Sequence, residues 1–229
     1  MFWIAVVPAV LSVAVLIVFV REPPEPARTG DAYRFRLALG SLGRAYWWLI
    51  VVAALFTLAR FSEAFLVLKA DDAGLAITLV PIVLVVMNVA YSLSAYPAGF
   101  VSDRLDRYGV LGCGALLLAA GDLVLAFADT VAATLVGVVL WGLHMGFTQG
   151  LFAALVADAS DERVRGTAFG VFNFITGIVL LAASVIAGVL WERFGPDATF
   201  LAGAGLTGAA CVVLWALHST GQLRTTKSA

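Results

Sequence analysis

Charged residues are scarce in this sequence. Only 13% of its 229 residues are Asp, Glu, Lys or Arg, whereas 62% are apolar and the mean hydropathy is +1.01. A soluble domain usually has about a quarter charged and about half apolar residues. The composition therefore excludes an ordinary soluble protein and predicts a membrane protein. A net charge of −1, with no basic patch that contains interleaved aromatic residues, also excludes a nucleic-acid-binding protein.

The residues and motifs of several other protein classes are also missing. The only two cysteines, Cys113 and Cys211, lie inside apolar runs, so we expect neither a disulfide nor a metal site. No H-E-x-x-H, G-x-S-x-G or paired histidines at ligand spacing occur, so we expect no enzyme and no cofactor. The absence of a G-x-x-x-x-G-K-[ST] loop argues against ATP hydrolysis.

Seven apolar stretches of about 20 residues are long enough to cross a bilayer, and lipid requires them to be helices. The expected spans are 2–20, 46–68, 75–97, 109–128, 131–156, 168–190 and 199–217. The first lacks a basic leader and a small-residue cleavage site, so we interpret it as a span rather than a signal peptide. The sequence thus predicts an all-α membrane protein with seven transmembrane helices. Its expected parts are an extra helix (1–20), a cytoplasmic linker (21–45), a six-helix domain (46–218) and a cytoplasmic tail (219–229).

Basic residues in the links predict the orientation. The links 21–45, 99–108 and 157–167, together with the tail, hold eleven Lys and Arg residues, whereas the opposite side holds only Lys69 and Arg193. Cytoplasmic loops are enriched in these residues. We therefore expect a cytoplasmic carboxy terminus and residue 1 outside, in a bacterial plasma (inner) membrane. A retinal photoreceptor would also have seven helices, but the two lysines, Lys69 and Lys227, lie in a link and in the tail rather than in a span.

An internal repeat relates two of the links. The stretch AGFVSDR, 98–104, and the stretch AGVLWER, 187–193, share the pattern A-G-x-x-x-acid-Arg. Three helices separate the copies, so they are expected on opposite faces of the membrane. This is the pattern of an inverted-topology repeat, which is typical of secondary transporters. Spans two to four then pair with spans five to seven in a 3+3 arrangement.

Two segments resemble the major facilitator superfamily (MFS). GFVSDRLDR, 99–107, resembles the loop signature G-x-x-x-D-R-x-x-R, which joins the second and third helices of each six-helix half in that family. VADASDERVRGTAFGVFN, 156–173, resembles the link between the fourth and fifth helices. The signature departs at Asp106, where glycine is usual, and at Tyr108, where a second basic residue is usual. The resemblance implies a carboxy-terminal half, preceded by the last helix of the amino-terminal half.

The resemblance also implies a function and partners. It implies a secondary active transporter of a small solute that works by alternating access, with proton coupling as a further expectation. A full member of the family has twelve helices, so we expect this chain to be incomplete alone. Its partners would be the lipid bilayer, the solute, and either a missing amino-terminal half or a second copy. The alternative is an inactive or assembly-dependent half-transporter, or a structural membrane subunit, without transport of its own.

The signature loop carries four candidate residues. In the family this loop acts as a latch that favours one orientation of the two halves. Gly99 would let two helix ends approach, and Asp103 would stabilise a helix N-terminus. Arg104 and Arg107 would anchor the cytoplasmic side and pair with carboxylates. The alternative is a plain charged turn that follows the positive-inside rule.

Ionisable residues inside spans are the first candidates for the transport path, because each costs roughly 2.5 to 3.5 kcal/mol on insertion scales. Arg60 and Glu63 lie three residues apart in the second span, on one helix face and close enough to pair. Glu63 would carry the proton in a coupled mechanism. The alternative is an ion pair that holds helices together.

The fifth span presents two different faces. At about 100° per residue, Trp141, His144 and Thr148 share one face. Glycines at positions 142, 146 and 150 form a close-packing ladder on roughly the opposite face. The first face is then free to line a cavity, in which His144 suits a proton relay. The alternative is a histidine bonded to the backbone of a neighbouring helix.

Uncharged polar residues inside spans are weaker candidates. Asn88, Tyr91 and Ser92 share a face of the third span, and Asn173 lies early in the sixth. They could bind a polar solute, although hydrogen bonds between helices are the favoured interpretation. Gln149 lies near the glycine face and is expected to bond across helices.

Two further residues are assigned structural roles. Asp122 is alone in the fourth span, and the corresponding helix of the family is peripheral, so we expect a buried structural carboxyl. Pro81 is expected to kink the third span.

Overall fold

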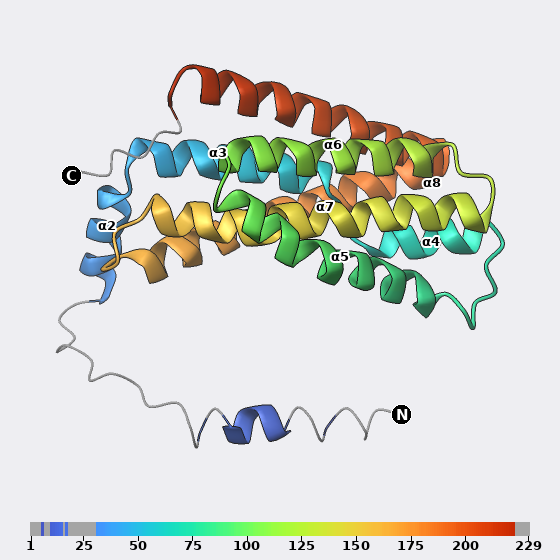
Figure 1. Cartoon of the computed structure of the whole chain (residues 1–229), viewed down its shortest axis with the longest axis horizontal. Helices are drawn as coiled ribbons and strands as arrows, with labels where there is room; N and C mark the ends of the chain where they lie inside the picture. Colours follow the sequence, from blue (N-terminus) through green and yellow to red (C-terminus); the bar gives the residue numbers. More distant parts are fainter. Residues whose placement is uncertain (1–5, 7–9, 16, 18–30, 223–229) are drawn as a thin grey trace. The chain divides into compact units, whose positions relative to one another are not determined.

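The computed structural model describes residues 6, 10–15, 17 and 31–222, and the chain divides into two units, 1–37 and 38–229 (Figure 1). In the first unit, Val6, residues 10–15 and Ile17 are helical. Most of the predicted span 2–20, residues 21–30 of the linker and residues 223–229 of the tail lie outside the described residues. A helix, α2 (Asp31–Ser41), lies within the segment predicted as a linker.

The described part of the chain is all-α, as predicted. After α2 come α3 (Arg44–Ala59), α4 (Ala64–Asp72), α5 (Pro81–Ser102), α6 (Arg107–Ala126), α7 (Val131–Asp158) and α8 (Arg165–Ser219). Within the described part of the chain, five segments are long and apolar enough to cross a membrane: α3 with α4 as one segment, and α5, α6, α7 and α8. Each of the six spans predicted between residues 46 and 217 falls on one of these segments.

Two of the predicted spans share α8. This helix has 55 residues, but Gly195 interrupts it with φ +87° and ψ 175°. Glycine adopts such a positive φ without a steric penalty, and Pro196 suits the first position of a new helix because it needs no backbone N–H. The chain turns back at Gly195 (Figure 1). We call residues 165–194 the first limb and 196–219 the second limb; they carry the predicted spans 168–190 and 199–217.

Two details of the predicted spans are wrong. The third span begins at Pro81 rather than at residue 75, so this proline starts α5 and does not kink it. The second span is broken between α3 and α4, at residues 60–63. The break buries the Phe61 ring among Phe65, Trp141 and Phe200, at centroid distances of 5.2, 5.7 and 5.5 Å. These aromatic contacts stabilise an interruption that no glycine or proline marks in the sequence.

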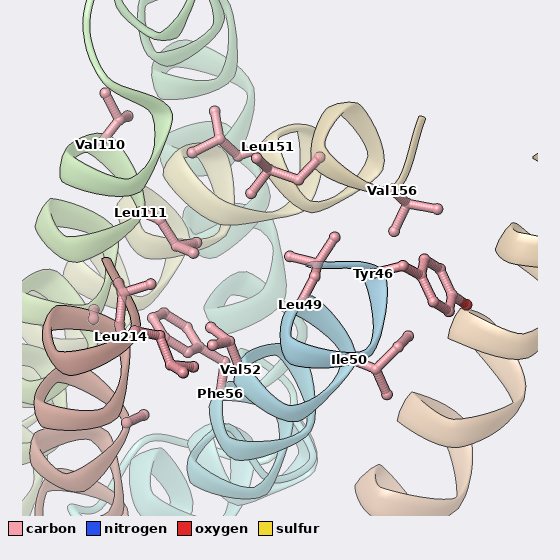
Figure 2. Packing of buried hydrophobic residues seen from close by; sticks show 14 of the residues in the cluster. Tyr46, Leu49, Ile50, Val52, Phe56, Val110, Leu111, Leu151, Val156 and Leu214 are labelled. Atoms are coloured by element: carbon pink, nitrogen blue, oxygen red, sulfur yellow. The ribbon is translucent and has the colours of Figure 1, made fainter. Parts of the chain in front are cut away.

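Apolar side chains from α3, α6, α7 and α8 fill the interior (Figure 2). In the same cluster, the buried Tyr46 hydroxyl of α3 donates a hydrogen bond of 2.9 Å to the carbonyl oxygen of Ala168, at the start of α8. Helix α7 packs between α5 and α6, while α8 packs against α3 and α6. Two glycines of the predicted ladder, Gly142 and Gly146, bring α7 close to α5, but Gly150 has open space beside it.

Ion pairs identify the two ends of this bundle. At one end, Arg107 of α6 pairs with Asp158 at the end of α7, and His218 of α8 lies 3.8 Å from Asp106. At the other end, the buried Lys69 of α4 lies 3.4 Å from Asp197, just after the turn at Gly195. The repeat copies at 98–104 and 187–193 thus lie at opposite ends, as an inverted repeat requires.

Candidate functional site

A cavity of about 420 Å³ lies between α3, α7 and the first limb of α8. Its size is that of a small-molecule site. Seven of its fourteen lining residues have polar side chains. The polar residues are Thr57, Arg60, His144, Thr148, Gln149, Asn173 and Thr176, and the others are Phe56, Phe152, Ala153, Phe169, Phe172, Gly177 and Leu180. The structure therefore brings together four predicted candidates from three different spans: Arg60, His144, Thr148 and Asn173.

Arg60 enters the cavity from the break in the second span. It is the first residue after α3, with φ −96° and ψ 86°, and is half-buried. The break also ends the i, i+3 geometry on which the predicted pair with Glu63 depends, and no oxygen of Glu63 lies within 4.0 Å of the guanidinium. Glu63 does not line the cavity. The expected ion pair is therefore wrong.

His144 is both bonded to a neighbouring helix and part of the cavity wall. Its Nδ1 lies 2.8 Å from the carbonyl oxygen of Gly114 in α6. A carbonyl oxygen only accepts, so Nδ1 carries the proton. In the neutral ring this leaves Nε2 as an acceptor. The hydrogen bond to the backbone of a neighbouring helix, which was the alternative role expected for His144, is thus present. The ring also lines the cavity.

Thr148 and Gln149 extend the α7 wall. The Thr148 hydroxyl donates to the carbonyl oxygen of His144 at 2.9 Å, within its own helix. Gln149 was expected to bond to another helix. Instead its half-buried side chain lines the cavity and makes no hydrogen bond to any residue that the structure describes. A polar side chain inside a span was a usable signal for a cavity residue. The position of Gln149 near the glycine face instead predicted a hydrogen bond to another helix, which is wrong.

Trp141 lies outside the cavity, contrary to expectation. Its fully buried indole Nε1 donates to Oδ1 of Asp122 in α6, at 2.8 Å. Oδ2 of Asp122 is also buried and has no hydrogen-bond partner among the described residues. The carboxyl therefore joins α6 to α7, in agreement with the structural role expected for Asp122.

The candidates of the third span do not reach the cavity either. Asn88 and Ser92 lie on an exposed face of α5, in a shallow apolar depression, and Tyr91 is half-buried against the interior. The Asn88 amide donates to the carbonyl oxygen of Leu84, one turn earlier in the same helix, at 2.8 Å. Among the described residues, then, Asn88 bonds within α5 rather than across helices.

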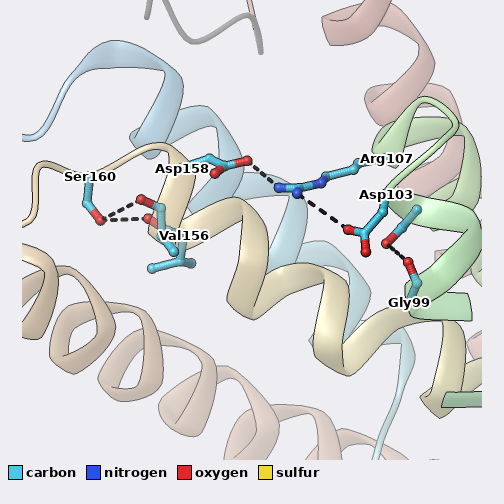
Figure 3. A network of polar contacts seen from close by, with 8 residues as sticks. Gly99, Asp103, Arg107, Val156, Asp158 and Ser160 are labelled. Atoms are coloured by element: carbon cyan, nitrogen blue, oxygen red, sulfur yellow. Dashed lines mark hydrogen bonds and ion pairs between the residues drawn. The ribbon is translucent and has the colours of Figure 1, made fainter. Parts of the chain in front are cut away.

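The signature loop joins three helix ends (Figure 3). Arg107 pairs with Asp158 of α7 and lies 4.0 Å from Asp103, one turn before it. The Arg104 guanidinium lies over the Phe100 ring, 4.0 Å from its centroid, and pairs with no carboxylate among the described residues. Arg107 therefore makes the carboxylate contacts that were expected of both arginines.

Two expectations for this loop are wrong. Asp103 follows the end of α5, and the residue that caps α6 is Asp106, whose side chain accepts from the Gly109 N–H at 2.8 Å. Asp106 occupies the position where the signature has glycine, so this departure supplies the N-cap. Gly99 is exposed, and a side chain there would meet nothing within 4 Å. It therefore allows no close approach to another described helix.

Comparison with known proteins shows the family. The family model of the Major Facilitator Superfamily matches residues 49–228. An uncharacterised MFS-type transporter of Methanocaldococcus jannaschii is 33% identical over 195 residues, which are 82% of this chain and 48% of the relative. The inner membrane transport protein YajR of Escherichia coli is 26% identical over 127 residues, 56% of this chain and 28% of the relative.

A solved structure supports the same fold. The crystal structure of the fucose:proton symporter FucP of Escherichia coli is similar with a TM-score of 0.71 at 18% identity, covering 97% of this chain and 55% of that one. The chain spans about half the length, or less, of the curated relatives that it matches. Since the family model covers most of the sequence and the described helices have the corresponding fold, the chain belongs to the Major Facilitator Superfamily.

Proposed function

We propose that residues 46–218 act as one six-helix half of a secondary active transporter that moves a small solute by alternating access. The observation that carries this proposal is the polar cavity between α3, α7 and the first limb of α8, inside an otherwise apolar bundle. Ionisable residues within membrane spans usually face the protein interior or a water-filled path. Arg60 and His144 both do so.

The depth of the cavity suits a substrate site. At a helical rise of 1.5 Å per residue, Arg60 lies about 24 Å along the segment that begins at Arg44. His144 lies at the midpoint of the 28-residue α7. Substrate sites of secondary transporters lie near the bilayer midplane, and interrupted helices often form them. The break at residues 60–63 is such an interruption.

A second six-helix unit would complete the path. Large apolar side chains of the first limb are exposed, including Phe174 at 69% and Leu181 at 68%. Lipid or protein must cover such a face in the membrane. We propose that a second half, either a separate segment or a second copy of this chain, closes the cavity, and that the isolated unit does not transport. The signature loop would act at the cytoplasmic face, with the carboxy terminus on the same side. Flux through a proven monomer in liposomes would contradict this requirement.

Proton coupling is a finer proposal that rests on His144 and Glu63. Nδ1 of His144 bonds to the Gly114 carbonyl oxygen, so the other ring nitrogen, Nε2, is the atom that would bind a further proton. The test is to replace each residue separately, Glu63→Gln and His144→Ala, in the complete transporter and to measure uptake against pH. A pH profile that neither substitution changes would rule out both residues as proton carriers.

Thiol labelling tests the transport path without knowledge of the solute. We would introduce Gly177→Cys, at a cavity position where the structure has open space, after removing both native cysteines. Gly208→Cys is the matched control, because it also has open space but lies outside the cavity, on the second limb. We expect a membrane-impermeant maleimide to label residue 177 from each side of the membrane, and residue 208 from neither. A residue 177 that is closed to both sides would refute the proposal.

A further inference from the structure

The cavity contains a cation, and no carboxylate in the described part of the chain lines it; Glu63 acts electrostatically on that cation, but from outside the cavity lining. Among the described residues, the Arg60 guanidinium has no ion-pair or hydrogen-bond partner, and no Asp or Glu lines the cavity. A charge in a low-dielectric site is stabilised by an opposite charge. On the basis of the proposed function, we propose that the solute is a small organic anion, a carboxylate with an apolar body, which binds with its carboxylate at Arg60.

The hydrogen-bonding groups of the cavity favour the same ligand. The hydroxyls of Thr57, Thr148 and Thr176 donate to carbonyl oxygens of their own helices, at 2.8, 2.9 and 2.7 Å. The amides of Gln149 and Asn173 make no hydrogen bond within the described part of the chain. The groups left for a ligand are thus the two amides, the five N–H groups of Arg60 and the acceptor Nε2 of His144, so that N–H donors outnumber acceptors. Such a set suits a ligand that is rich in acceptors, and a guanidinium matches a carboxylate in bidentate geometry.

The remaining wall fits an apolar body. Phe56 and Phe152 contact each other edge to face at a centroid distance of 5.5 Å, and Phe152 lies 6.2 Å from Phe172. These rings border the same cavity as Arg60. A neutral sugar would leave the guanidinium without an opposite charge inside the cavity, and an organic cation would be repelled by it. A carboxylate on an aromatic or aliphatic group satisfies both parts of the lining.

The first measurement compares the rates at which thiol reagents of opposite charge modify the Gly177→Cys variant. The assembly is extracted from its native membrane and studied in detergent. The anionic reagent is 2-sulfonatoethyl methanethiosulfonate and the cationic one is its trimethylammonioethyl analogue, each normalised to its rate with free mercaptoethanol. We expect the anionic reagent to be favoured about tenfold or more. Arg60→Gln should abolish the preference, whereas Arg60→Lys should keep it. Arg193→Gln, which removes an exposed cation outside the cavity, should leave it unchanged.

The second measurement uses protection from labelling. Phenylacetate at 10 mM should slow the labelling of residue 177, and phenylacetamide, its uncharged analogue, should not. Labelling without charge preference, equal protection by the two compounds, or no protection by phenylacetate would each overturn the anion assignment while leaving the transport path intact. A residue 177 that reacts with neither reagent would overturn both the assignment and the proposed function.

Discussion

The close approach of α5 and α7 makes a quantitative prediction about Gly142. A Cβ at this position would overlap the carbonyl oxygen of Met87 and lie 2.8 Å from the Cβ of Ala90. The obstacle is largely backbone, so no side chain can rotate away and the two helices must separate. At Gly150, two turns further along α7, a Cβ would meet nothing within 4 Å. The two glycines thus form a matched pair on one helix.

The expected effects have opposite signs. Replacing glycine with alanine inside a helix stabilises the folded state by about 0.5 to 1 kcal/mol when the site has room. Overpacking a dense interior costs about 1 to 3 kcal/mol. Gly142→Ala should therefore destabilise the protein by about 1 to 2 kcal/mol, whereas Gly150→Ala should stabilise it by about 0.5 kcal/mol or more.

Thermal unfolding in one detergent, followed by tryptophan fluorescence, measures the difference. For a chain of this size each kcal/mol shifts Tm by about 2 to 4 °C. We expect Gly142→Ala to melt below the wild type and Gly150→Ala at or above it. If both variants melt above the wild type, α5 and α7 do not approach each other as the structure indicates, and the packing argument fails.

Three further predictions use the same assay. Gly203→Ala should lower Tm by several degrees, because its Cβ would lie 2.6 Å from Oδ2 of Asp122, while Gly205→Ala, with open space, should not. Arg107→Gln should lower stability by less than about 1 kcal/mol, and by less still in high salt, because its ion pairs are partly exposed; a larger loss would show that the pairs are shielded from solvent. Tyr46→Phe should cost about 0.5 to 1.5 kcal/mol, because it removes the hydroxyl that joins α3 to α8; an unchanged Tm would count against that bond.

The candidates that periodicity placed correctly belong to uninterrupted helices. His144 and Thr148 reach the cavity from α7 because a regular helix turns about 100° per residue, so residues four apart share a face. Gly142 lies against α5 for the same reason. Arg60 was identified by a different argument, the cost of placing a charge in a span, and that argument does not depend on the local backbone.

The details that the sequence did not predict depend on contacts between distant segments. The break at residues 60–63 has no glycine or proline, and its stabilising contacts come from Trp141 and Phe200, far along the chain. Once the helix is broken, the spacing of Arg60 and Glu63 no longer places them on one face. Trp141 shares a face with His144, but its indole N–H has a partner in Asp122 and its side chain does not line the cavity. Asp106, by contrast, left a local signal, since aspartate before a helix is a preferred N-cap.

The two walls of the cavity differ in how firmly they are held. Helix α7 has twelve buried residues, and its glycines at 142 and 146 face α5. Sliding α7 would force backbone against backbone, and packed interiors resist such deformation. The first limb of α8 has only three buried residues, Ala168, Ala183 and Ala187, all with small side chains. Segments with few buried contacts rearrange at lower free-energy cost than those with many. In the isolated unit we therefore expect the first limb to move more readily than α7, so that Arg60 and Asn173 change their separation while His144 keeps its bond to α6.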